Sequence, residues 1–193
     1  IINLFMRFYE FDRGQILIDG QDIKDYSQEA LRKSIGLVLQ EPFLYHGTIA
    51  SNIRMYHKEL TDEDVRQAAA FVDVADFIES LPGGYDHPVT ERGSTLSTGQ
   101  RQLLAFARTI AAQPKILILD EATANIDQET EEMIQNSLKK MRQGRTTIAI
   151  AHRLSTIQDA DCIYVLDKGK IIESGNHDQL IALGGTYKKM YDL

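Results

Sequence analysis

Two short apolar runs, Ile35–Leu39 and Ile116–Leu119, most constrain how this chain can fold. The first run is continuous, which is typical of a strand buried on both faces of a parallel sheet. The second also consists of residues that are usually buried. From about residue 48 to 112, between the two runs, the apolar spacing is helical. The sequence therefore predicts an α/β protein, in which a parallel sheet is flanked by helices.

The remaining elements follow from the same spacing rules. Residues 1–9 have helical spacing with no capping residue ahead of them, so we expect the chain to begin inside a helix. Further predictions are strands at residues 15–19, 115–120 and 146–151, helices beginning at Thr61–Asp64 and spanning residues 128–141, and a closing hairpin over residues 162–173. Cys162 is the single cysteine and has apolar neighbours, so we expect it in a buried strand rather than as a reactive thiol.

Composition argues against two classes of protein. The chain is 43% hydrophobic and 25% charged, with a formal net charge of -7. These proportions are near those of soluble globular domains, and without a Lys/Arg cluster we expect no nucleic-acid partner. No segment approaches the roughly 18–20 apolar residues that span a bilayer, and the first residues do not form a signal peptide, so we expect a domain of cytosolic character. An anionic ligand remains compatible, because backbone N–H groups and helix N-termini bind phosphates.

Two adjacent carboxylates follow the second apolar run. Asp120 and Glu121 lie where the predicted strand ends, and ligands of open α/β sheets bind at the carboxyl ends of strands. An Asp there can orient Mg²⁺, which takes few protein carboxylates. The next carboxylate can accept a proton from an attacking water. Taken alone, a solvated acidic pair that ends a strand is the commoner explanation.

A predicted helix start lies upstream of these carboxylates. Ser97 is followed by Thr98, Gly99 and Gln100, and the apolar spacing of residues 101–108 is helical. Free N–H groups and the positive end of the helix dipole make such a start a site for anions. An ordinary Ser N-cap explains the same residues equally well.

Together these segments resemble the nucleotide-binding domain of ABC transporters. Ser97–Gln100 resembles the signature motif, usually Leu-Ser-Gly-Gly-Gln, and Ile116–Glu121 resembles the Walker B strand. Gln40 resembles the Q-loop glutamine, Ala124–Asp127 the D-loop, and His152 the switch histidine. The matches occur in the family's order and cover essentially the whole chain. The resemblance implies a P-loop NTPase (RecA-like) parallel-sheet core with an inserted α-helical subdomain.

The resemblance also implies a role for each residue near the strand ends. Asp120 would hold Mg²⁺, and Gln40 would sense Mg²⁺ or water and couple the site to the membrane part. Glu121 would polarise the hydrolytic water, and His152 would contact the γ-phosphate of ATP. Considered without the other motifs, a strand-end His is more often structural. The implied activity is ATP hydrolysis that powers transport.

The signature residues are implied to act on a second nucleotide. In the family, the signature of one domain covers ATP bound to the other. Ser97, Thr98, Gly99 and Gln100 would therefore contact ATP across an interface, together with Asp127 of the D-loop. The resemblance thus implies a partner, a second nucleotide-binding domain arranged head to tail.

The loop before the signature favours an exporter. Val89–Gly93 resembles the exporter-type loop that touches the coupling helices of the transmembrane domain, here through Glu91 and Arg92. Glu41–Ile49 and Asn52–Ile53 also look like the exporter Q-loop region. We therefore expect part of a multidrug or lipid exporter at the cytoplasmic face of the cell membrane, with the transmembrane domain of the same transporter as a partner. A solvated Glu91–Arg92 charge pair remains the alternative.

Two features depart from the family pattern. Thr98 stands where Gly is usual and adds a side chain near the expected phosphate. With Glu121 retained, this fits one half of a heterodimer, although a homodimer that tolerates Thr98 stays open. The Gly-x-x-x-x-Gly-Lys-[Ser/Thr] loop is expected just before Ile1 but is absent from the chain. We therefore expect the isolated piece, with the N-terminal part of the domain missing, to be inactive and to bind MgATP weakly.

The resemblance divides the chain into two parts. Residues 1–45 and 112–193 are assigned to the RecA-like core, and residues 46–111 to the helical signature subdomain. Two other functions remain open, a soluble ABC ATPase without a membrane partner and a non-catalytic ABC module. The exporter-like loop argues against the first, and the presence of Glu121 and His152 argues against the second.

Overall fold

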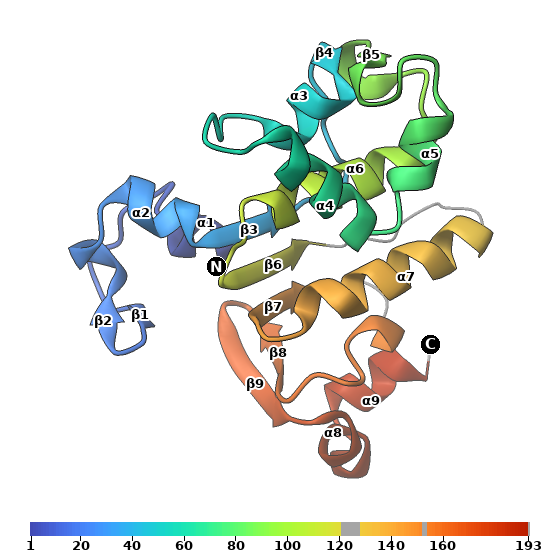
Figure 1. Cartoon of the computed structure of the whole chain (residues 1–193). Helices are drawn as coiled ribbons and strands as arrows, with labels where there is room; N and C mark the ends of the chain where they lie inside the picture. Colours follow the sequence, from blue (N-terminus) through green and yellow to red (C-terminus); the bar gives the residue numbers. More distant parts are fainter. Residues whose placement is uncertain (121–127, 152–153, 193) are drawn as a thin grey trace. The chain divides into compact units, whose positions relative to one another are not determined.

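The computed structural model describes residues 1–120, 128–151 and 154–192 (Figure 1). Contacts divide the chain into two compact units, Ile1–Ile148 and Ala149–Leu193. Its described helices are α1 (Ile2–Phe5), α2 (Gln28–Lys33), α3 (Ile49–Arg54), α4 (Asp62–Phe71), α5 (Ala75–Ser80), α6 (Thr98–Ala111), α7 (Gln128–Arg142), α8 (His177–Leu183) and α9 (Thr186–Tyr191). Its described strands are β1 (Leu17–Ile18), β2 (Gln21–Asp22), β3 (Ile35–Val38), β4 (Gly47–Thr48), β5 (Pro88–Val89), β6 (Ile116–Asp120), β7 (Thr146–Ile150), β8 (Ile163–Asp167) and β9 (Lys170–Gly175).

The two apolar runs form strands, as predicted, and these strands are neighbours in the sheet. The sheet has the order β3-β6-β7, and β3 pairs with β6 in parallel. Successive side chains of a strand point to opposite faces, so β6 contributes to two separate hydrophobic clusters. Leu117 and Leu119 belong to the cluster that contains α4, α6 and α7, whereas Ile116 and Ile118 belong to the cluster beneath α1 and α2. Burial on both faces explains why the run has no polar alternation.

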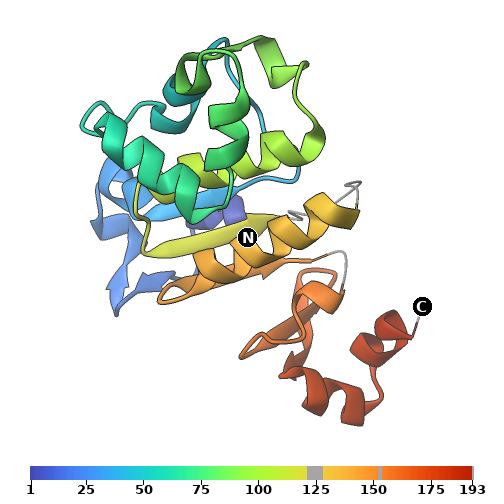
Figure 2. The same cartoon turned by 45° about the vertical axis from the view of Figure 1, so that its right-hand side comes forward.

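The helical layer packs on the first of these faces. Helix α6 is buried along most of its length and contacts α3, α4, α7 and β3 (Figure 2). Helix α7 joins the same cluster through Ile134, Leu138 and Met141. The hydroxyl of Ser137, which is fully buried, donates to the carbonyl of Val72 at 2.9 Å. One apolar core therefore joins the sheet to α4, α6 and α7.

Gly36 permits this close packing. A Cβ at this position would lie 2.6 Å from Cγ2 of Thr109 and 2.8 Å from Cγ of Pro114. Such distances are shorter than van der Waals contact, so a larger residue would displace the end of α6 from β3. The glycine therefore sets how closely α6, which begins at the signature segment, approaches the sheet.

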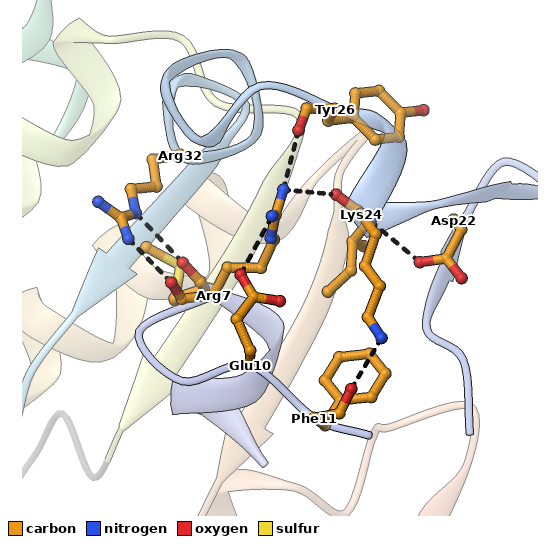
Figure 3. Close-up of polar contacts among 9 residues, drawn as sticks. Arg7, Glu10, Phe11, Asp22, Lys24, Tyr26 and Arg32 are labelled. Carbon is orange, nitrogen blue, oxygen red and sulfur yellow. Dashed lines mark hydrogen bonds and ion pairs between the residues drawn. The ribbon is translucent and has the colours of Figure 1, made fainter. Parts of the chain in front are cut away.

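Two arginines, Arg7 and Arg32, hydrogen-bond the end of α1 to the segment that leads into α2 and to α2 itself (Figure 3). Arg7 donates to the carbonyls of Ile23 and Tyr26 at 3.2 and 2.9 Å. Arg32 on α2 donates to the carbonyls of Met6 and Arg7 at 3.2 and 3.0 Å. Arg32 thus satisfies carbonyls that follow the end of α1, whereas Arg7 joins the end of α1 to the turn at Ile23–Asp25. The helix expected over residues 1–9 is thus shorter than predicted, ending at Phe5 with Arg7 in a left-handed conformation at φ 50°.

The second unit contains the predicted hairpin. Strands β8 and β9 pair antiparallel, and Ile163, Leu180 and Tyr187 form a small core with α8 and α9. The expectation for Cys162 is wrong, because this residue precedes β8 and is exposed. Ile163, the first residue of the strand, takes the buried position instead. An apolar neighbourhood in sequence therefore did not decide which side chain is buried.

None of the helices in the described part of the chain is both long enough and apolar enough to span a bilayer.

Candidate functional site

The carboxyl ends of β3 and β6 bring two predicted site residues to one edge of the sheet. Val38 pairs with Leu119 in parallel register. Asp120 is the next residue of β6, and Gln40 follows Val38 by two positions. Because the strands are parallel neighbours, both side chains start from the edge at which ligands of α/β sheets bind. Asp120 is half-buried and Gln40 is exposed.

The donor chemistry of this edge fits Mg²⁺. The carboxylate of Asp120 and the carboxamide of Gln40 both offer oxygen atoms, the ligands that Mg²⁺ prefers. This ion usually takes one or two protein carboxylates and completes its shell with water and phosphate oxygens. Within residues 1–120, 128–151 and 154–192, no three His, Cys, Asp or Glu side chains gather as a metal site. A Mg²⁺ ion whose coordination shell is completed by water and phosphate oxygens does not need a cluster of three such side chains.

The signature segment begins α6 with a reciprocal pair of hydrogen bonds. Ser97 is the N-cap, and its hydroxyl accepts from the amide of Gln100 at 3.1 Å. In return, Oε1 of Gln100 accepts from the amide of Ser97 at 2.9 Å. The Ser97 hydroxyl keeps its proton and the Gln100 carboxamide keeps two N–H groups. The amides of Thr98 and Gly99 also lie in the first turn, where no carbonyl of the helix accepts from them. The helix start therefore offers several donors to an anion.

Thr98 is turned toward its own helix. Its hydroxyl accepts from Nη2 of Arg101 at 3.1 Å. Nη1 of Arg101 also donates to the carbonyl of Leu96 at 2.9 Å and, more weakly, to that of Gly93 at 3.5 Å. Thr98 itself is exposed. The residue that replaces the usual Gly is thus held by a hydrogen bond, while its methyl group still adds bulk at the start of α6.

The loop before the signature packs against the segment that follows Gln40. The amide of Arg92 donates to the carbonyl of Leu44 at 3.0 Å, and Arg92 is left-handed at φ 62°. A Cβ on Gly93, which is also left-handed, would lie 2.9 Å from Cδ1 of Leu44. Glu91 and Arg92 are both exposed, and the described structure records no ion pair between them. Both charged side chains are therefore accessible to a partner.

Three of the predicted site residues lie outside the described residues. These are Glu121, His152 and Asp127, the last residue of the predicted D-loop. Their roles stay predictions. The described part of the site consists of Gln40, Asp120 and the signature segment.

Sequence reasoning assigned no role to Arg108, and it placed Asn52 only within the exporter-like Q-loop region. Arg108 lies on the half-buried side of α6 and donates to main-chain and side-chain oxygens of the segment after Gln40. Burial lowers the pKa of its guanidinium, and the hydroxyls of Tyr45 and Tyr56 act in the opposite direction. The sequence signal that could have identified Arg108 is its position among the apolar residues of the predicted helix. A charged side chain that is partly buried needs hydrogen-bond acceptors, so such a position indicates a polar network.

Comparison with known proteins identifies the family. The family model described as ABC transporter matches residues 1–124, which is more than half of the chain. This chain belongs to the ABC transporter family. The predicted resemblance to ABC nucleotide-binding domains is therefore confirmed, although the match ends before Asp127 and His152.

Two curated relatives match the entire chain. The putative ABC transporter ATP-binding protein exp8 of Streptococcus pneumoniae is 75% identical over 193 residues, which are 100% of this chain and 33% of that protein. The probable multidrug resistance ABC transporter ATP-binding/permease protein YheH of Bacillus subtilis is 52% identical over 193 residues, or 100% of this chain and 29% of that protein. The chain thus spans about a third of the length of these ABC proteins.

A solved structure confirms the fold. The structure of a bacterial Atm1-family ABC exporter with ATP bound matches with a TM-score of 0.90 and 44% identity. The match covers 99% of this chain and 33% of that exporter chain. The α/β core with a parallel sheet, predicted from the apolar runs and the motifs, is the P-loop NTPase fold of ABC nucleotide-binding domains.

Proposed function

We propose that this chain is part of the nucleotide-binding domain of an ABC exporter of the multidrug or lipid type, and that the whole protein hydrolyses ATP to power transport. The observation that carries the proposal is the position of Gln40 and Asp120 at the carboxyl edge of adjacent parallel strands. Relatives named as multidrug and fatty acid transporters, and the Atm1-family neighbour, support the exporter assignment.

At the sheet edge, this chain's residues bind and orient the reactants. Asp120 and Gln40 supply oxygen ligands for Mg²⁺, which neutralises phosphate charge when bound. Glu121 accepts the proton of the attacking water, and His152 donates a hydrogen bond to the γ-phosphate.

The signature segment acts on the nucleotide of a second domain. Ser97, Gly99 and Gln100 offer a hydroxyl, first-turn amides and a carboxamide, which together suit a triphosphate. Asp127 lies at the same interface. Thr98 slows hydrolysis of the nucleotide that its signature segment covers. This favours a heterodimer whose other half carries the usual signature.

The rest of the chain connects the site to its partners. Residues 46–111 form the helical signature subdomain, and residues 1–45 and 112–193 belong to the RecA-like core. Glu91 and Arg92, exposed beside the segment after Gln40, contact the coupling helices of the transmembrane domain. The domain accordingly works at the cytoplasmic face of the cell membrane.

Magnesium dependence of hydrolysis tests this function. In the purified full-length transporter, Asp120→Asn should raise the Mg²⁺ concentration for half-maximal ATP hydrolysis by about tenfold or more, because it removes a metal ligand. Asp167→Asn is the matched control, since Asp167 also ends a strand, β8, and is exposed. An unchanged Mg²⁺ dependence in the Asp120 variant would refute the assignment.

A further inference from the structure

Arg108 on α6 binds a segment that is distant in sequence. Its Nε donates to the carbonyl of Asn52 at 2.7 Å, and Nη1 donates to the carbonyl of Phe43 at 2.9 Å. Nη2 donates to Oδ1 of Asn52 at 3.1 Å. The guanidinium also lies over the ring of Tyr45, 5.8 Å from its centroid. A single side chain thus bonds both ends of the segment from residue 43 to 52.

Asn52 completes the network from inside the segment. Its side chain is buried, with 2% of the residue exposed. Oδ1 accepts from the amide of Tyr45 at 2.8 Å, and Nδ2 donates to the carbonyls of Tyr45 and Thr48 at 2.8 and 3.0 Å. Arg108 and Asn52 therefore fix the backbone of the segment at several points. A polar network with its buried groups satisfied favours one conformation over others.

This segment lies between the two nucleotide-facing parts of the domain. It begins three positions after Gln40 in the chain. Its residue Leu44 accepts a hydrogen bond from the amide of Arg92, just before the signature. Strand β4 within it pairs with β5, and α3 packs along α6 (Figure 1). The segment is therefore bonded to the signature helix by Arg108 and to the loop before the signature by its backbone.

The chemistry of the network requires an arginine. The guanidinium presents several N–H groups in a fixed plane, so it can bond three oxygens from two directions at once. A lysine would keep the charge and most of the aliphatic stem, but its ammonium is a compact point charge that cannot reproduce the fork. The half-buried Arg108 is stabilised only while these acceptors stay in place.

We infer that Arg108 is a positioning residue that, through Asn52, holds the segment after Gln40 against the signature helix, so that Gln40 and the helix that begins after Ser97 keep fixed positions relative to each other. The inference rests on the proposed function, because Gln40 and the signature segment act on ATP only if the whole protein is an ABC ATPase. Arg108 itself touches no reacting atom. Its loss should slow turnover more than it weakens nucleotide binding.

The full-length transporter allows a direct test with a matched control. Arg145 is also half-buried and bonds main-chain carbonyls, those of Pro114 at 3.0 Å and Met141 at 2.8 Å, but it does not touch the segment after Gln40. Arg108→Met and Arg145→Met therefore remove similar bonds at different places. We expect kcat to fall about tenfold or more in the Arg108 variant and less than about threefold in the Arg145 variant. The dissociation constant of MgATP should change less than about threefold in both.

A second variant and a second measurement keep the test independent of folding yield. Arg108→Lys retains charge and bulk, and it should show the same fall in kcat with near-normal binding. Hydrogen exchange of the amides of residues 43–52 should become faster in both Arg108 variants, while exchange in α4 stays as in the wild type.

Two results separate the inference from the function on which it rests. If the Arg108 variants lose no more turnover than Arg145→Met, or if exchange rises everywhere alike, Arg108 has only a structural role and the inference is wrong. If instead the wild-type transporter shows no Mg²⁺-dependent hydrolysis, the proposed function fails.

Discussion

The sheet edge and the start of α6 are built in different ways. Gln40 and Asp120 lie at the same edge of the sheet only because β3 and β6, which are far apart in sequence, pair in parallel register. Ser97 and Gln100 bond each other within one turn of helix. The first arrangement depends on the whole core of the unit, whereas the second depends on neighbouring residues. Changes in the core should therefore disturb the edge more than the cap, and the following variants test that difference.

Gly36→Ala should have the largest effect on stability. The added Cβ would meet Thr109 and Pro114 at 2.6 and 2.8 Å. We expect the free energy of unfolding of the full-length nucleotide-binding domain to fall by about 1–3 kcal/mol, because overpacking displaces side chains or backbone. Chemical denaturation would measure the change. Adding Thr109→Ser, which removes the methyl carbon nearest to the new Cβ, should recover part of the loss. A Gly36→Ala domain as stable as wild type would show that the packing of α6 on β3 adjusts to an added Cβ at no cost.

Ser97→Ala should cost about 1 kcal/mol of stability, because it removes a helix N-cap. Thr61→Ala is the matched control, since Thr61 caps α4 with the same reciprocal bonds, to Asp64. Both variants should lose similar stability in thermal melts. Only the Ser97 variant should lose ATP turnover in the full-length transporter, because the proposed function places ATP at the start of α6 and not at the start of α4. Equal turnover in the two variants would mean that the Ser97 cap is structural alone.

Thr98→Gly should act in the opposite direction on activity. It removes the hydroxyl that Arg101 bonds and restores the family's usual residue. We expect turnover of the full-length protein to rise, while stability falls by less than about 1 kcal/mol because Gly is a poor helix former. Steady-state ATPase assays with Thr98→Ser as the comparison separate the bulk of the methyl group from the hydrogen bond. A fall in turnover with Gly would show that Thr98 is adapted to this site.

The smallest effect on stability is expected at α9, whose first amides are capped by the side chain of a residue on β9. Glu173 on β9 accepts hydrogen bonds from the amides of Tyr187, at 2.9 Å, and Thr186. The Tyr187 amide, followed by that of Thr186, lowers the pKa of the Glu173 carboxyl below its ordinary value. This contribution to stability is therefore present above the unfolded-state pKa and is lost as pH falls through the lower folded-state value. Glu173→Gln should reduce the loss of stability in acid. An identical pH profile for the variant would contradict this.

Local sequence patterns predicted the elements well where neighbouring residues decide the structure. The N-cap at Thr61, the start of α6 after Ser97 and the strand ending at Asp120 were all identified from spacing and capping residues. Cys162 was placed wrongly because burial depends on which strand residue faces α8 and α9. The sequence could not show this, since nothing local distinguishes Cys162 from Ile163.

Long-range polar contacts were the part that sequence could not predict. The bonds from Arg108 to Phe43 and Asn52 join residues from different elements, and no spacing rule links them. That Gln40 and Asp120 belong to one site was implied only by resemblance to the family, and strand register explains why both lie at the same edge of the sheet. The roles of Glu121, Asp127 and His152 stay predictions.

Turnover of a Glu121→Gln variant tests the central claim most directly. The measurement is steady-state ATP hydrolysis by the reconstituted full-length transporter, with its partner half if it is a heterodimer. Glu79→Gln on α5, an exposed residue, is the matched control. We predict that the Glu121 variant loses about 100-fold or more of the turnover at the site that it serves, because its general base is gone, while the control keeps wild-type turnover. Wild-type turnover in the Glu121 variant would contradict the account.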